Sequence, residues 1–80
     1  MTNESKKAIF AELVKAFVSE DNRAKNKARE IEEHFVGLYD DDEDMDDFQY
    51  ALAMYDGSVE NHKALMSECR WFLNHKYGDL

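Results

Sequence analysis

Hydrophobic residues recur at helical spacing in the first half of the chain. In residues 4–18 they form one broad stripe, made of Ile9, Phe10, Leu13, Val14, Phe17 and Val18. In residues 22–36 and just beyond they alternate at spacings of four and three, at Ala24, Ala28, Ile31, Phe35 and Leu38. Such spacings place side chains on one face of an α-helix. Two amphipathic helices are therefore predicted over residues 4–18 and 22–36.

The second half repeats this pattern in two further stretches. Residues 41–56 place Met45, Phe48, Leu52 and Tyr55 on one face. Residues 59–76 line an inner face with Leu65, Met66, Cys69, Phe72 and Leu73, and His62 lies on the same side. Gly37 and Gly57 follow the second and third stretches, where a left-handed glycine commonly ends a helix, and Ser58 can cap the fourth. The sequence therefore predicts four helices with short connections.

Four helices of similar length joined by short turns favour antiparallel neighbours. The predicted fold is all-α, a small antiparallel (up-down) four-helix bundle, with residues 1–80 forming a single domain. The composition agrees, because the chain has no proline, three glycines and 44% hydrophobic residues. A chain of 80 residues buries only about 60% of its unfolded surface, so these apolar faces must pack well.

Charge is distributed unevenly along the chain, which has a net charge of −8. Residues 30–60 contain twelve acids and no lysine or arginine, whereas residues 21–29 carry a local charge of +3. Such acidity repels nucleic acid and anionic membranes and favours basic proteins as partners. No apolar run reaches membrane-spanning length, and the single cysteine, Cys69, cannot form an internal disulfide. We expect a cytoplasmic protein with no direct contact to nucleic acid or membrane.

The basic residues of the second predicted helix lie toward its N-terminus, which the helix dipole disfavours. We expect carboxylates of another helix to compensate them, with Glu60 or Glu68 as candidates. Ser19 and Asp21 lie just before this helix, and either side chain is able to cap it.

The most function-like stretch is the acidic run Asp40–Asp47, in which only Met45 is not a carboxylate. Asp40 can cap the third helix, and Glu43 completes a pair resembling a capping box. Asp46 and Asp47 are then expected beyond the first turn, where the helix dipole no longer favours acids. The predicted partner-binding residues are those expected on the outside of the third and fourth helices: Glu43, Asp46, Asp47, Tyr50, Met54 and Trp71. The alternatives are a merely solvated acidic face and a different helix phase that buries the aromatics.

Metal and catalytic motifs receive little support. As a calcium loop starting at Asp40, the acidic run has Met45 where an EF-hand needs glycine and lacks the glutamate at its twelfth position. His62 and Cys69 lie seven residues apart on one face, but two ligands are too few for a zinc site. No nucleophile, phosphate-loop or zinc-protease motif occurs. We therefore predict no metal, no cofactor and no enzymatic activity.

The first functional hypothesis is a small acidic protein-binding module that covers a basic surface, such as the nucleic-acid site of a nuclease. In its general character, which is short, acidic and helical, the chain resembles bacteriocin immunity proteins and other small inhibitors of nucleic-acid enzymes. This likeness is one of class, and no motif carries it. The alternatives are a homo-oligomeric assembly protein, so that monomer and homodimer both stay open, and a weakly cation-responsive helical protein.

Overall fold

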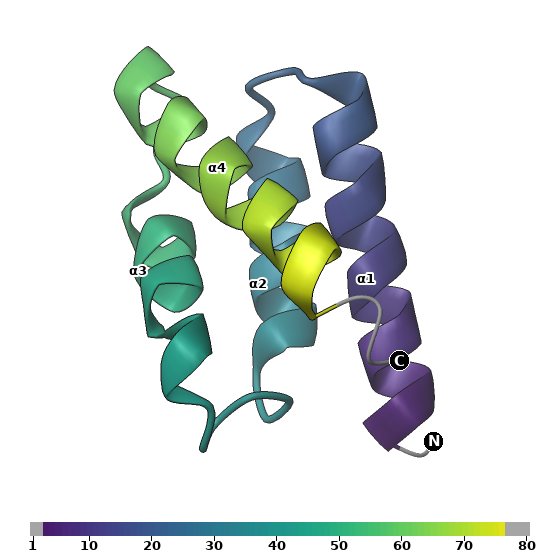
Figure 1. Ribbon diagram of the computed structural model, residues 1–80. Coiled ribbons are helices and arrows are strands. Elements are labelled where there is room, and N and C mark those ends of the chain that lie inside the picture. The colour runs from purple at the N-terminus through teal and green to yellow at the C-terminus, as the bar shows by residue number, and fades with distance from the viewer. Residues whose placement is uncertain (1–2, 77–80) are drawn as a thin grey trace.

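The computed structural model describes residues 3–76, and these residues form only helices and turns. The elements are α1 (Asn3–Glu20), α2 (Lys25–Phe35), the single 3-10 turn η1 (Glu43–Met45), α3 (Asp46–Met54) and α4 (Val59–His75) (Figure 1). The all-α prediction is confirmed, and each of the four predicted stretches contains a helix. The predicted helices over 22–36 and 41–56 are too long, since α2 and α3 both begin later and end earlier.

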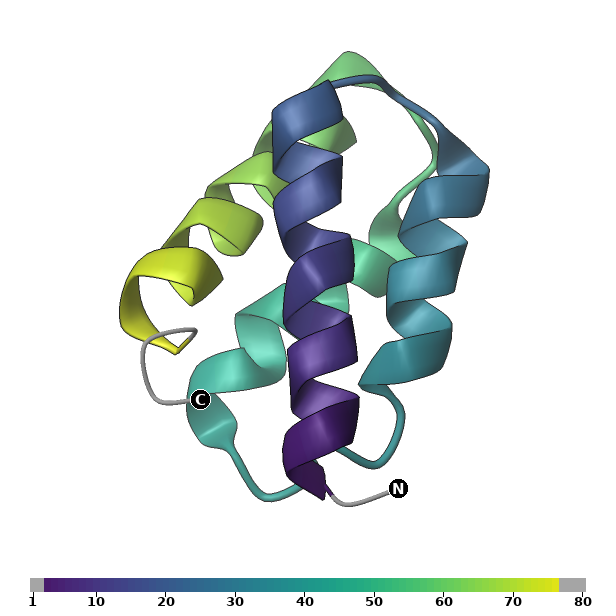
Figure 2. The ribbon, with the colours of Figure 1, turned by 90° about the vertical axis from the view of Figure 1, so that its right-hand side faces the viewer.

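The antiparallel bundle is present only in part. Each helix packs against the next along the chain, and α1 also packs against α4. Helices α1 and α2 lie side by side, whereas α4 slants across the molecule from α3 toward α1 (Figure 1). In the second view α3 is also inclined to α1 (Figure 2). The helices therefore enclose one core without the near-parallel alignment of a regular bundle.

Phe10 lies at the centre of the core and is fully buried. Its ring centroid lies 5.7 Å from that of Phe35, 5.8 Å from Tyr39, 5.7 Å from Phe48 and 5.2 Å from Phe72. These rings come from every helix and from the segment after α2. Aromatic pairs at such separations contribute about 0.5–1.5 kcal/mol each beyond their burial. The predicted inner faces therefore meet around one aromatic centre.

The burial pattern confirms most of the predicted core. The predicted inner residues of α3 are almost completely buried: Met45, Phe48, Leu52 and Tyr55. In α1 the stripe is narrower than predicted, because Phe10, Val14 and Phe17 are buried while Ile9 and Leu13 are only half-buried. Ala11 completes the buried face, since a small side chain lets neighbouring helices approach closely.

Gly37 and Gly57 adopt the predicted left-handed conformation, but each lies in the turn after its helix, since α2 already ends at Phe35 and α3 at Met54. Gly37 follows α2 and Gly57 follows α3, and both have φ of +83°, a conformation that side-chain-bearing residues rarely adopt. Ser58 caps α4, with its Oγ accepting a hydrogen bond of 3.3 Å from the backbone N–H of Asn61. These local signals were sufficient to place the turn between α3 and α4.

The predicted start of the third helix is wrong. Tyr39 is buried against Phe10, so the chain turns around this ring before a helix begins. Asp42, not Asp40, acts as the cap, and its Oδ1 accepts a hydrogen bond of 3.0 Å from the backbone N–H of Asp44. The α-helix itself begins only at Asp46. The capping-box pair of Asp40 and Glu43 therefore does not form.

The predicted caps of α2 are also wrong. Ala24 occupies the N-cap position without a side-chain hydrogen bond to the helix. Asn22 Oδ1 instead accepts a bond of 3.2 Å from the backbone N–H of Ala24, just before the helix. Asp21 has φ of +46° and directs its carboxylate to His62 on α4, with Oδ1 3.0 Å from Nε2. Asp21, which was predicted to cap α2, thus links the segment after α1 to α4.

Candidate functional site: the α3–α4 groove

A surface groove runs between α3 and α4 and consists of two adjoining hollows of about 290 and 400 Å³. Both hollows are lined by Asp47, Ser67 and Glu68, which form the middle of the groove. We call this surface the α3–α4 groove. Its remaining side chains, beyond that shared middle, are Tyr50, Ala51, Met54, Asn61 and Ala64 at one end and Glu43, Asp44 and Trp71 at the other.

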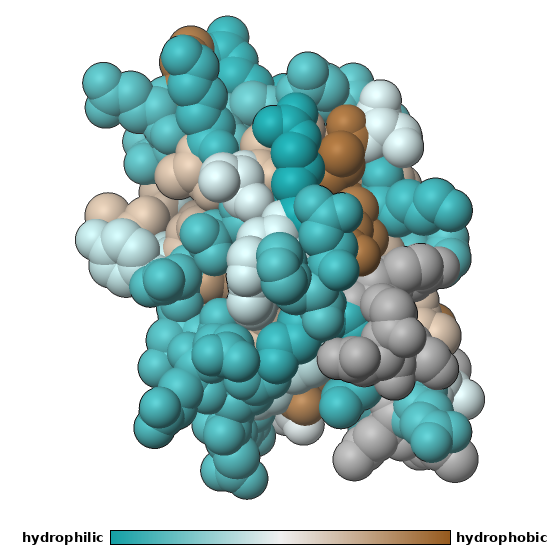
Figure 3. All heavy atoms as spheres, viewed as in Figure 1, coloured by the Kyte–Doolittle hydropathy of each residue, from teal (hydrophilic) through white to brown (hydrophobic). Residues whose placement is uncertain are grey.

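The groove brings together five of the six residues predicted to bind a partner: Glu43, Asp47, Tyr50, Met54 and Trp71. Asp46 is not among the lining residues, although it is exposed in the first turn of α3. Hydrophilic side chains cover most of the face seen in Figure 3 and gather over η1 and the start of α3. The predicted residues thus lie on a largely polar face.

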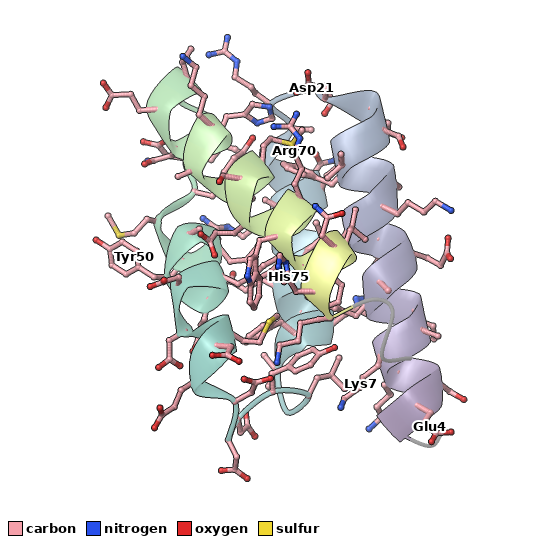
Figure 4. The ribbon with its side chains drawn as sticks, viewed as in Figure 1. Glu4, Lys7, Asp21, Tyr50, Arg70 and His75 are labelled. Atoms are coloured by element: carbon pink, nitrogen blue, oxygen red, sulfur yellow. The ribbon has the colours of Figure 1, made fainter. Side chains whose placement is uncertain are left out.

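One end of the groove combines two exposed apolar side chains. Tyr50 is 67% exposed and Met54 is 51% exposed. Figure 4 shows Tyr50 projecting from α3 away from the other helices. Packing inside the chain therefore does not account for these two residues.

The turn beside Tyr50 and Met54 is held in place by hydrogen bonds. Asn61 Nδ2 donates to the carbonyl oxygen of Met54 and to Asp56 Oδ1, at 3.0 Å in each case. Hydrogen bonds from the Ser58 hydroxyl, from the Ser58 backbone N–H and from Asn61 lower the pKa of Asp56 to about 2. Because Asp56 stays ionised at neutral pH, this turn keeps its hydrogen bonds and fixes the position of α4 relative to the end of α3.

The middle of the groove places two carboxylates close together. Burial, and secondly the negative charge of Asp47, raise the pKa of Glu68 above its ordinary value. Neither hollow has a lysine, arginine or histidine among its lining side chains. The repulsion between Asp47 and Glu68 is thus not compensated by any side chain lining the groove.

A cation does lie near the acidic end. Lys76 Nζ is 2.8 Å from Asp42 Oδ2 and 3.5 Å from Asp44 Oδ2. The hydrogen bond from Lys76 is the main cause that lowers the pKa of Asp42, and the same bond raises the pKa of Lys76. The single charge of Lys76 partly offsets the charges of Asp42 and Asp44, and Lys76 makes no ion pair with Asp47 or Glu68.

Trp71 differs from the prediction that placed it outside. Its side chain is half-buried and packs against the core, while its indole also borders the acidic end of the groove. The ring stacks on His75 one turn later, with centroids 5.6 Å apart and planes 19° apart. Trp71 therefore supports the fold as well as contributing surface.

The positions of Asp46 and Asp47 relative to the helix dipole also differ from the prediction. Since α3 begins at Asp46, both acids lie in its first turn, where they are favoured by the dipole. The prediction that they lie beyond this turn is wrong. A structural role therefore accounts for Asp46, whereas Asp47 has that role and also lines the groove.

Arg29, one of the basic residues of α2, has partners that its sequence position does not predict. Its guanidinium donates to the carbonyl oxygens of Leu52 at 3.0 Å and Tyr55 at 2.7 Å, at the C-terminal end of α3. A third bond of 3.1 Å joins it to Glu32 on its own helix. The expected carboxylate partners on another helix, Glu60 or Glu68, do not bind it. The positive charge of Arg29 instead offsets the negative partial charge of the carbonyl oxygens at the C-terminal end of α3.

Two candidate reactive side chains, His62 and Cys69, are buried as predicted. Burial raises the pKa of the Cys69 thiol to about 12, so the nucleophilic thiolate is scarcely populated at neutral pH. Within residues 3–76, no three histidine, cysteine or acidic side chains converge closely enough to hold a metal ion. The arrangement around the α3–α4 groove is thus suited to contact and charge complementarity.

None of the helices in the described part of the chain is long and apolar enough to cross a membrane. Comparisons of the chain with protein families, with curated proteins and with solved structures find no match.

Proposed function

We propose that this chain is a small acidic protein-binding module whose α3–α4 groove receives a basic segment of a partner protein. One observation carries the proposal: the groove places exposed Tyr50 and Met54 beside the carboxylates Asp47 and Glu68, with no cation lining it. Aromatic residues and methionine are enriched in protein interfaces, where they serve as anchors.

The charge of the groove supports a cationic partner. The pKa of Glu68 is raised by burial and by Asp47, so the ionised groove stores electrostatic repulsion. A lysine or arginine placed between these two carboxylates would relieve that repulsion and form charge-assisted hydrogen bonds. A neutral or acidic partner would gain neither effect. Binding should therefore favour a basic surface over other protein surfaces.

We further propose that this basic surface is a nucleic-acid-binding site, which the acidic groove would occupy in place of nucleic acid. The chain would then act as an inhibitor of immunity type, with its high net negative charge accelerating association with the partner. A cytoplasmic setting belongs to the same proposal, since Cys69 is buried and is the only cysteine of the chain.

The test uses two double variants of equal net charge. Asp47→Asn with Glu68→Gln removes the central carboxylates of the groove, and Asp40→Asn with Asp41→Asn removes two exposed acids that do not line it. Tagged versions of both variants and of the wild type are used to capture partners from an extract of the native host, followed by mass spectrometry and measurement of binding rates. We expect the groove variant to associate at least about tenfold more slowly and with a weaker salt dependence.

Tyr50→Ala separates contact from charge in the same assay. Because an anchor acts after the encounter, we expect faster dissociation with little change in association rate. The proposal fails if the captured proteins and their rates are the same for wild type, both double variants and Tyr50→Ala at low and high salt.

A further inference from the structure

A separate hollow, of about 310 Å³, lies on the flank of α4 away from the α3–α4 groove. Its lining includes three cations, Arg23 from the segment before α2 and Lys63 and Arg70 from α4. His62 and Asp21 lie at its wall. Figure 4 shows Arg70 at the same end of the molecule as Asp21, away from η1 and the acidic run. We call this surface the basic hollow.

The three cations of the basic hollow have no carboxylate partner within ion-pair distance among residues 3–76. Asp21 is the one carboxylate in the lining, and its Oδ1 is engaged by His62 Nε2 at 3.0 Å. In a chain whose net charge is −8, carboxylates are abundant, yet the hollow gathers positive charge. The side chains that line the hollow thus carry a net positive charge, opposite in sign to the net charge of the whole chain.

The wall of the hollow is fixed by a chain of buried contacts. The Tyr55 hydroxyl lies 3.0 Å from His62 Nδ1, and Phe17 packs on the same imidazole with centroids 5.7 Å apart. Burial raises the pKa of Tyr55, so its hydroxyl keeps the proton. On the other side of the ring, His62 Nε2 lies 3.0 Å from Asp21 Oδ1. Contacts at both ring nitrogens and against Phe17 therefore hold the imidazole in one orientation.

Asp21 extends this rigid wall to the segment that carries Arg23. Its φ of +46° is uncommon for a residue other than glycine, and its carboxylate contacts His62 on α4. The segment after α1 is thereby anchored to α4, which positions Arg23 over the same hollow as Lys63 and Arg70. Three cations from two separate parts of the chain therefore line one hollow.

We propose that the basic hollow binds a small molecule that carries a phosphoryl group. Two guanidinium groups and an ammonium group suit the several oxygens of a phosphate, because arginine pairs with phosphate through two parallel hydrogen bonds. Val59 and Met66 supply apolar lining for the remainder of an esterified ligand. Long nucleic acids are disfavoured by the acidic remainder of the chain, whereas a small anion senses mainly charges within the Debye length of about 8 Å. The site is separate from the proposed function of the α3–α4 groove.

The test is a nuclear magnetic resonance titration of the full chain with two probes, inorganic phosphate and phenyl phosphate, at constant ionic strength and neutral pH. The ring resonances of His62 report on the hollow directly, because this side chain lines it. We expect saturable shifts of His62 and of the backbone amides of Lys63 and Arg70. Tighter binding of phenyl phosphate assigns the site to a phosphate ester, and equal binding assigns it to free phosphate.

Lys63→Gln and Arg70→Gln should each weaken binding by about tenfold, the usual contribution of one charge-assisted hydrogen bond. Lys15→Gln is the matched control, because it removes the same charge from an exposed position of α1 outside the hollow. Both altered residues of the hollow are exposed, so the variants should keep the wild-type spectrum elsewhere. The proposal is overturned if the shifts rise linearly without saturation, or if Lys15→Gln weakens binding as much as the other two. It is equally overturned if the hollow is covered by a second copy, which would appear as concentration-dependent shifts and a dimer mass in light scattering.

Discussion

The residues on the inner face of α3 and those on its outer face are explained by different physical causes. The inner face carries Phe48 and Leu52, and Met45 and Tyr55 flank the helix on the same side; each of the four is at most 1% exposed. The outer face carries Asp47, Tyr50 and Met54, and the two apolar side chains among them are more than half exposed. Burial explains the inner residues, whereas packing inside the chain does not explain Tyr50 and Met54. One short helix therefore separates a face that stabilises the chain from a face available to a partner.

The largest expected effect is at the inner face. Phe48→Ala should lower the free energy of unfolding by about 3–5 kcal/mol, the usual loss when a fully buried phenylalanine leaves a cavity. Phe48 is fully buried and packs on Phe10, Phe35 and Phe72. Chemical denaturation followed by circular dichroism measures the change.

Tyr50→Ala is the control for this prediction on the opposite face of the same helix. Since Tyr50 is 67% exposed, its removal should change the free energy of unfolding by less than about 0.5 kcal/mol. Equal losses at positions 48 and 50 would contradict the separation of the two faces of α3.

An intermediate loss in the free energy of unfolding is expected at the C-terminal end of α3. Arg29→Met keeps the length of the side chain and removes its hydrogen bonds to the carbonyl oxygens of Leu52 and Tyr55. Hydrogen bonds from a charged group contribute about 1.5–3 kcal/mol, and partial exposure of Arg29 reduces this, so we expect a loss of about 1–2 kcal/mol.

Glu32→Gln is the matched control for Arg29. It removes only the ion pair with Arg29, in which both side chains are about 40% exposed, and should cost under about 0.5 kcal/mol. If Glu32→Gln costs as much as Arg29→Met, the ion pair rather than the carbonyl contacts anchors the end of α3.

The inner faces of the helices could be predicted from the sequence, because apolar residues spaced three and four positions apart mark the buried face of a helix. The same repeat does not record where a helix begins. Tyr39 is buried through contact with Phe10, 29 positions earlier in the chain, and this contact delays the helix to Asp46. The prediction for Trp71 was wrong in a similar way, because helical spacing within α4 does not show how α4 is oriented on the other helices, and the half-buried indole packs against the core.

The candidate site was predictable where its residues are neighbours in the sequence. Glu43, Asp47, Tyr50 and Met54 belong to one helical stretch, and their shared face follows from spacing alone. Glu68 lies on another helix, and only the packing of α3 against α4 places it beside Asp47.

The polar contacts that were missed are separated even further along the chain. Asp21 and His62 lie 41 positions apart, and Arg29 and Tyr55 lie 26 positions apart. Distance in sequence, and not an unusual residue type, concealed these contacts.

The smallest expected change in the free energy of unfolding concerns Glu68 in the α3–α4 groove. Its sign tests whether the carboxylates of the groove repel one another. Because the folded-state pKa of Glu68 is raised, the ionised carboxylate costs stability above that pKa, and the cost disappears as the pH falls through it toward the ordinary value. Glu68→Gln should therefore raise the free energy of unfolding slightly at neutral pH, by under about 0.5 kcal/mol. The difference from wild type should vanish in acid, where Glu68 is protonated in both the folded and the unfolded chain.

Asp42→Asn gives the opposite sign and serves as the control for Glu68→Gln. The pKa of Asp42 is lowered by its hydrogen bond from Lys76, so its ionised form stabilises the folded chain above the ordinary pKa, and this contribution is lost as the pH falls through the lowered value. Asp42→Asn should therefore lower the free energy of unfolding at neutral pH.

In an Asp47→Asn background, the increase in the free energy of unfolding caused by Glu68→Gln should shrink, because part of the repulsion is already absent. Thermal unfolding across the pH range measures all of these differences. A loss of stability on Glu68→Gln at neutral pH would mean that this carboxylate already has a favourable partner in the chain, and the case for a groove awaiting a cation would fail.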